Sequence, residues 1–150
     1  MKQFADKLAL ISITLWVGAL WAVGYIAAPT LFYHLPDRQL AGSLAGGMFT
    51  IVAYIGMACG AYLLLNRITK FGGQAFKQGF FWAALLMLLF TIAGHFGIAP
   101  MMAKLKADAL PSDVMHSVFA DRFQTWHGMA SIAYAIQSVL GLVLVLKAAR

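Results

Sequence analysis

Four long stretches without charged residues dominate this sequence and restrict the folds open to it. They cover about residues 8–32, 48–65, 79–102 and 125–146. A helix needs about 20 apolar residues to cross a bilayer, and an uncharged run of this length at each place meets that need. The sequence therefore predicts an all-α polytopic membrane protein, in which four transmembrane helices form a bundle and a single domain over residues 1–150.

Composition supports the same class. Hydrophobic residues make up 62% of the chain and charged residues 11%, whereas soluble domains are about half apolar and a quarter charged. The net charge of +6 comes from basic residues beside the apolar stretches, where helix ends meet lipid headgroups. We therefore expect the lipid bilayer, and not nucleic acid, to be the partner of this charge. The single cysteine, Cys59, cannot form an internal disulfide.

The first apolar stretch is longer than the core of a signal peptide. Lys2 and Lys7 precede it as they would in a secretory signal, but 8–33 is an uncharged run of 26 residues, and a signal core has about 7–15. We expect it to remain as a transmembrane helix.

The distribution of charge predicts the orientation. If the N-terminus is cytoplasmic, the segments on that side hold seven basic residues and one acidic residue, Asp6, and the outer segments hold four of each. The seven basic residues are Lys2, Lys7, Arg67, Lys70, Lys77, Lys147 and Arg150. Because cytoplasmic loops carry the excess of lysine and arginine, we predict a bacterial inner-membrane protein with cytoplasmic N- and C-termini.

Two outer connections carry helical patterns of their own. Pro111-Ser112-Asp113 resembles a helix start with Ser112 as the cap. Met115, Phe119, Phe123 and Trp126 follow at spacings of four, four and three, which predicts a short amphipathic helix at the membrane interface. A shorter helix is expected at 37–47, ended by Gly46-Gly47 before the second span.

Glycines and other small residues favour close packing of the helices. Gly56 and Gly60 are four residues apart in the second span, a spacing at which two helix backbones can approach closely in lipid. This step predicts packing within the bundle, with a homo-oligomer as the alternative.

Histidines are the main candidates for function. His95 lies within the third span, about 10 Å inward from Met102 at about 1.5 Å per residue, and Thr91, His95 and Met102 are predicted to share one face. His127 opens the fourth span, with Met129 beside it, and His34 ends the first. The alternative for each is a structural histidine that is hydrogen-bonded to a neighbouring helix or partly hydrated. His116 is expected in solvent.

These residues suggest a site for copper or haem in the outer half of the bundle. Histidine nitrogen and methionine sulfur suit copper(I), and His95, His127, Met102 and Met129 are the predicted metal ligands. A b-type haem would instead take His95 with His127 or His34 as axial ligands. The chain has no glutamate, and no set of nucleophile, histidine and acid is found, so the sequence favours a protein that is not an enzyme.

Two segments resemble a known family. The run from Leu15-Trp16-Val17-Gly18 to Ala28-Pro29-Thr30-Leu31-Phe32 resembles the first helix of the CopD-like superfamily of small membrane proteins. Within that superfamily the whole chain resembles the DUF4149 family, which includes a eukaryotic transmembrane protein linked to cisplatin resistance. Trp126-His127-Gly128 followed by Ser131 is similar to the start of that family's last helix.

The resemblance implies copper or haem at histidines, because the superfamily also includes CopD-type copper-resistance proteins and HemJ-type protoporphyrinogen oxidases. Leu31-Phe32-Tyr33-His34 is loosely similar to a stretch of the latter, but the lysine that follows a histidine in a later helix of those enzymes is absent here. Three hypotheses follow: a protein that binds or transports copper, a haem-containing redox protein, and an accessory subunit of a larger membrane complex in which the polar groups only pack.

Overall fold

The computed structural model describes residues 2–149 and confirms an all-α protein with four helical spans that are long and apolar enough to cross a membrane. The spans are Gln3–His34, Arg38–Lys77, Gly79–Ala109 and Ala120–Ala148. No strand occurs within 2–149. Each span is longer than its uncharged run, because each helix continues through charged residues at one end or at both ends.

The helical segments follow one another with short breaks. The first span consists of α1 (Lys2–Ala22), the π-helix η1 (Val23–Ala27) and α2 (Ala28–His34). The second consists of α3 (Arg38–Phe71) and the 3-10 helix η2 (Gly72–Lys77). The third consists of α4 (Gly79–Ala93), the π-helix η3 (Gly94–Ile98) and α5 (Ala99–Ala109), and the 3-10 helix η4 (Val114–His116) leads to α6 (Ala120–Ala148).

Both π-helices stand directly before an Ala-Pro pair. Ala28-Pro29 follows η1 and Ala99-Pro100 follows η3. Proline cannot donate a backbone hydrogen bond, and its ring clashes with the carbonyl four residues earlier. A wider turn before the proline relieves that clash without ending the helix, and at both prolines this turn is a π-helix.

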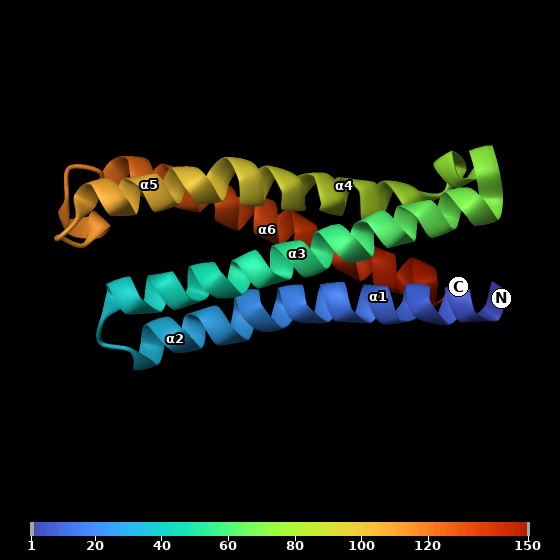
Figure 1. Ribbon diagram of the computed structural model, residues 1–150, viewed down its shortest axis with the longest axis horizontal. Helices are drawn as coiled ribbons and strands as arrows, with labels where there is room; N and C mark the ends of the chain where they lie inside the picture. Colours follow the sequence, from blue (N-terminus) through green and yellow to red (C-terminus); the bar gives the residue numbers. More distant parts are fainter. Residues whose placement is uncertain (1, 150) are drawn as a thin grey trace.

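The spans run alternately up and down, so that both termini lie at one end of the bundle. Figure 1 shows α1 and α2 beside the antiparallel α3, with α4 and α5 across from them and α6 passing behind. We call the end that holds the termini the terminal end. The opposite end, which holds the α2–α3 and α5–α6 connections, is the distal end.

The main core lies toward the terminal end. Trp16 and Met87 are fully buried at its centre, and the cluster is formed by Ile13, Trp16, Val17, Cys59, Leu63, Phe80, Ala83, Ala84, Met87 and Leu144. The Trp16 ring lies directly against Gly56 and Gly60, where an added Cβ would collide with it. The glycine step of the second span is therefore occupied by packing inside the bundle, as its spacing predicted.

Polar side chains link the helices at several depths. Thr91 of α4 hydrogen-bonds to Gln137 of α6 at 3.3 Å, and both residues are buried. The Tyr134 hydroxyl of α6 donates to the Leu20 carbonyl of α1, and Tyr25 of η1 hydrogen-bonds to Ser138 of α6 at 2.7 Å. These bonds satisfy polar groups that would otherwise be unpaired in lipid.

The prediction of a separate helix at 37–47 is wrong. The helix α3 begins at Arg38 and continues unbroken through Gly46-Gly47. Asp37 caps it, since its carboxylate accepts hydrogen bonds from the backbone N–H groups of Gln39 (2.9 Å) and Leu40 (3.1 Å). Two adjacent glycines lower helix propensity, but tertiary packing and a strong cap outweigh that cost here.

The amphipathic pattern of the longer connection is divided between two elements. Only the three residues Val114–His116 form a helix before α6, and Asp113, not Ser112, caps it by accepting from the Met115 N–H at 2.9 Å. The aromatic residues Phe119, Phe123 and Trp126 pack on Leu105, Ala109 and Val114. The spacing of these aromatic residues therefore arises from the packing of α6 on α5 and on the connection. No separate interfacial helix forms between Ala109 and Ala120 beyond the three residues of η4.

Candidate functional site

Three of the four histidines lie on the surface of the distal end. His34 ends α2 and His116 lies in η4; both are exposed. His127 lies in the second turn of α6, where its exposed ring stacks on Phe123 with centroids 6.0 Å apart and planes at 10°. The alternative that these histidines are partly hydrated stays a prediction.

His95 has a different environment. It lies in η3, near the midpoint of the third span, and is half-buried. Its ring meets Tyr54 of α3 edge-on at a centroid distance of 5.0 Å, and Phe96 at 4.7 Å. Tyr54 is 57% exposed. Within residues 2–149, no hydrogen bond joins the Tyr54 hydroxyl or the His95 imidazole to another group of the protein, so their contacts are aromatic only.

Thr91 and His95, which were predicted to share a face, contact different helices. Thr91 is buried and bonds to Gln137 of α6, whereas His95, four residues later, meets Tyr54 of α3. His95 is only the second residue of η3, so the wider turn changes its direction little relative to Thr91. The prediction that Thr91, His95 and Met102 lie on one face stays a prediction.

The helix register also separates His95 from His127. The Thr91–Gln137 hydrogen bond fixes α4 against the antiparallel α6. Four residues beyond Thr91, His95 is then level with about residue 133 of α6, and His127 lies a further six residues toward the distal end. At about 1.5 Å per residue, that offset is about 9 Å along the axis.

The predicted ligands are thus not brought together at one point. Met129 is exposed near His127, and Met102 is half-buried in α5. In the part of the chain that the structure describes, no group of three or more His, Cys, Asp or Glu residues could hold a metal ion. The copper and haem sites at His95, His127, His34, Met102 and Met129 stay predictions.

Four glycines with open Cβ positions lie in the same two spans as Tyr54 and His95. Gly94 and Gly97 of η3, and Gly46 and Gly47 of α3, have nothing within 4 Å of the position that a Cβ would take. Gly46, Gly47 and Gly97 are exposed. At these positions the backbones of α3 and η3 are open to close approach by another helix. We call the surface around Tyr54 and His95 the Tyr54–His95 face.

Tyr54 did not emerge from the sequence, although a usable signal exists. The spans of α3 and α4–α5 form an antiparallel hairpin, so residues at the same depth have numbers with a nearly constant sum. Tyr54 and His95 sum to 149, and Gly42, whose Cβ position lies 3.4 Å from the Lys106 Nζ, sums with Lys106 to 148. A search for polar partners of His95 with that sum would have found Tyr54.

Comparisons with known proteins give one match. A family model described as a domain of unknown function, DUF4149, matches residues 11–111. Neither a search of curated proteins nor a search of solved structures found a match. The matched region includes most of the first span and all of the second and third, with both π-helices and the Tyr54–His95 face. Because the match covers more than half of the 150 residues, the chain belongs to the DUF4149 family.

Proposed function

We propose that this integral membrane protein is an accessory subunit that binds a helix of another membrane protein at the Tyr54–His95 face. The observation that supports it is the pairing of two polar aromatic side chains, at mid-span depth, on a surface with no covering helix. A hydroxyl and an imidazole facing hydrocarbon would lack hydrogen-bond partners, and ionisable residues at this depth usually face protein or water. A partner helix would supply the missing partners.

Open glycines in the same two spans favour a helix as the partner. Small residues let two backbones approach closely, which strengthens dispersion contacts and hydrogen bonds where lipid provides no hydrophobic drive. Open Cβ positions at Gly46, Gly47, Gly94 and Gly97 provide that surface on two adjacent spans. Elsewhere in the bundle, Tyr134, Tyr25 and Gln137 have partners inside the protein.

Site-specific photo-crosslinking in native membranes tests this proposal. A benzophenone amino acid placed at Tyr54 or Phe96 should give one discrete crosslinked band, because both side chains are exposed on the proposed face. The same probe at Ile132 of α6, which is 65% exposed on another span, should give none. The combined change of Tyr54→Phe and His95→Leu should reduce crosslinking from Phe96 severalfold.

Two further results decide the nature of the partner. Co-expression of two differently tagged copies shows whether the band is a second copy of this chain, since a homodimer would then carry both tags. Equal crosslinking from Phe96 and from Ile132 would contradict the proposal. Unchanged crosslinking in the Tyr54→Phe, His95→Leu variant would do the same, provided that this variant melts at the wild-type temperature in detergent.

Copper or haem binding is the second candidate, because His95 is accessible and lies in a π-helix, an element common at functional sites. The test is an ultraviolet–visible spectrum with metal analysis of the purified chain. A haem ligated by His95 would give a Soret band that disappears in His95→Leu, and copper would give bound metal without that band. If the protein stays colourless and metal-free after reconstitution with copper or with haem, both the copper and the haem hypotheses are wrong.

We also propose that the terminal end faces the cytoplasm of a bacterial inner membrane. The excess of basic residues beside the termini supports this orientation. Maleimide labelling of single cysteines, in a Cys59→Ser background, tests it. A cysteine at Gly73, in η2, should be labelled only after the membrane is opened, and a cysteine at Ser112 should be labelled in intact cells. The opposite labelling pattern would show that the terminal end faces away from the cytoplasm.

A further inference from the structure

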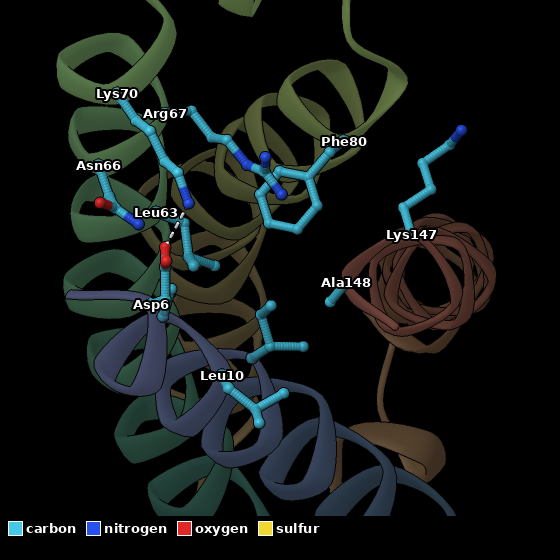
Figure 2. A pocket seen from close by; sticks show the side chains of 11 residues that line it. Asp6, Leu10, Leu63, Asn66, Arg67, Lys70, Phe80, Lys147 and Ala148 are labelled. Carbon is cyan, nitrogen blue, oxygen red and sulfur yellow. Dashed lines mark hydrogen bonds and ion pairs between the residues drawn. The ribbon is translucent and has the colours of Figure 1, made fainter. Parts of the chain in front are cut away.

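A pocket at the terminal end combines basic side chains with an apolar floor. Its volume is about 350 Å³, and α1, α3, α4 and α6 all contribute to it. Figure 2 shows Arg67 and Lys70 on one side, and Leu10 and Leu63 at the base. Sequence reasoning assigned these basic residues only to membrane orientation, since nothing in their spacing indicates that the fold brings them around one cavity.

The pocket carries excess positive charge. Arg67, Lys70 and Lys147 line it, against the single carboxylate of Asp6, so the lining has a net charge of +2. The Asp6 carboxylate is already paired with the Lys70 ammonium at 2.6 Å. Within residues 2–149, Arg67 has no carboxylate partner, since Lys70–Asp6 is the one ion pair there. The charge of Arg67 is therefore left for an anion.

The Arg67 guanidinium is held in place by neutral groups. It lies 3.9 Å from the centroid of the Phe80 ring, and one of its nitrogens donates to Gln78 Oε1 at 3.3 Å. A cation over an aromatic face is stabilised without being neutralised. The stacking orders the guanidinium before any ligand arrives, and its remaining N–H groups form the planar fork that suits phosphate oxygens.

The floor of the pocket is apolar. Ile13, Leu63 and Phe80 are at most 4% exposed, and they belong to the main core. Leu10 points into the pocket from α1 and Ala148 lies opposite on α6 (Figure 2). The pocket thus has a cationic upper part and a hydrocarbon lower part, near the ends of the spans.

We propose that this pocket binds the phosphate group of an anionic phospholipid from the leaflet at the terminal end, with Arg67 as its main ligand. Lys70 and Lys147 add positive charge, and the glycerol and upper acyl carbons lie over Leu10 and Ile13. Basic pockets between transmembrane helices bind anionic headgroups in this way. The proposal is independent of the Tyr54–His95 face, because the two lie on different parts of the bundle.

Native mass spectrometry of the full chain, titrated with phosphatidylglycerol or phosphatidylcholine, tests the proposal. We expect one phosphatidylglycerol molecule to be retained, with an affinity about tenfold above that of phosphatidylcholine. Arg67→Gln should lower the affinity for phosphatidylglycerol about tenfold, which corresponds to one charge-assisted contact. Arg122→Gln, an equal change of charge near the distal end, should leave it unchanged. Arg67→Lys should fall between wild type and Arg67→Gln, because it keeps the charge but not the fork.

Inorganic phosphate distinguishes a soluble ligand from a lipid. If phosphate alone raises the melting temperature of the wild type but not of Arg67→Gln, and phosphatidylglycerol is not preferred over phosphatidylcholine, a free phosphate compound replaces the lipid as the ligand. If Arg67→Gln and Arg122→Gln lowered the affinity for phosphatidylglycerol equally, the proposal that this pocket binds a phosphate group would be wrong. A far-ultraviolet circular dichroism spectrum and a melting temperature for each variant separate loss of ligand from loss of fold.

Discussion

The π-helices η1 and η3 have the same length and the same Ala-Pro pair after them, and they begin 71 residues apart, at Val23 and Gly94. Their surroundings differ. In η1 the Tyr134 ring covers Gly24, whereas in η3 nothing lies within 4 Å of the Cβ positions of Gly94 and Gly97. One irregular turn is thus closed by a neighbouring helix of the same chain, and the other is left open beside His95. A π-helix alone does not mark a binding surface; the side that is left uncovered does.

The largest difference between the two turns should appear on adding a methyl group to each. Gly24→Ala places a Cβ in collision with the Tyr134 ring, which cannot move away easily. That ring is held by the hydroxyl bond to Leu20 and by an edge contact with Phe49 at 5.4 Å. We expect the free energy of unfolding to fall by about 2–3 kcal/mol, as in an overpacked core, measured by detergent-induced unfolding of the purified chain.

A second substitution checks the cause. Tyr134→Ala removes the ring that Gly24→Ala would strike, so the double variant should be less destabilised than the sum of the two single variants. Strict additivity would mean that the collision is not the source of the loss. Gly94→Ala is the matched control in η3. If it lowered the free energy of unfolding as much as Gly24→Ala, the two π-helices would not differ in how closely they are packed.

The fold could be predicted from the sequence. That η1 is covered by a neighbouring side chain and η3 is not could not be predicted. Long uncharged runs predicted four spans, because the bilayer imposes a minimum length of apolar helix. Which side of each irregular turn would be covered depends on where Tyr134 lies on α6, a helix more than 100 residues away in sequence.

The candidate site was only partly predictable for the same reason. His95 was identified from its depth in a span, but its contact with Tyr54 depends on how η3 packs beside α3. A periodicity of 3.6 residues carries no information about such a contact. The histidines at the distal end were identified by type, and the offset of His127 from His95 along the axis followed only from the register of α4 against α6.

Removing the hydrogen bond that ties each span to α6 just before its π-helix should lower the free energy of unfolding by an intermediate amount. Thr91 precedes η3 as Leu20 precedes η1, and each is bound by α6. Thr91→Val keeps the shape but leaves the buried Gln137 without that partner, so we expect a loss of about 1–2 kcal/mol in the free energy of unfolding. Tyr134→Phe removes only the bond to the Leu20 carbonyl and should cost about 0.6–1 kcal/mol.

Both values are measured by the same detergent unfolding, with Thr14→Val as the control. Thr14 bonds only to the Leu10 carbonyl of its own helix and is exposed. Thr14→Val should therefore change the free energy of unfolding by at most about 0.5 kcal/mol. A loss in Thr91→Val no larger than in Thr14→Val would show that the link to α6 contributes nothing to stability.

The smallest effect on the isolated chain should come from Gly97→Ala, and this variant separates stability from binding. The added Cβ meets nothing within 4 Å, and alanine favours helix over glycine, so the free energy of unfolding should change by at most about 0.5 kcal/mol. A partner helix that packs on the η3 backbone would, however, meet the same methyl group, so the Phe96 photo-crosslink should fall severalfold. An unchanged crosslink would mean that no helix approaches η3 closely, and the open turn would then face only lipid.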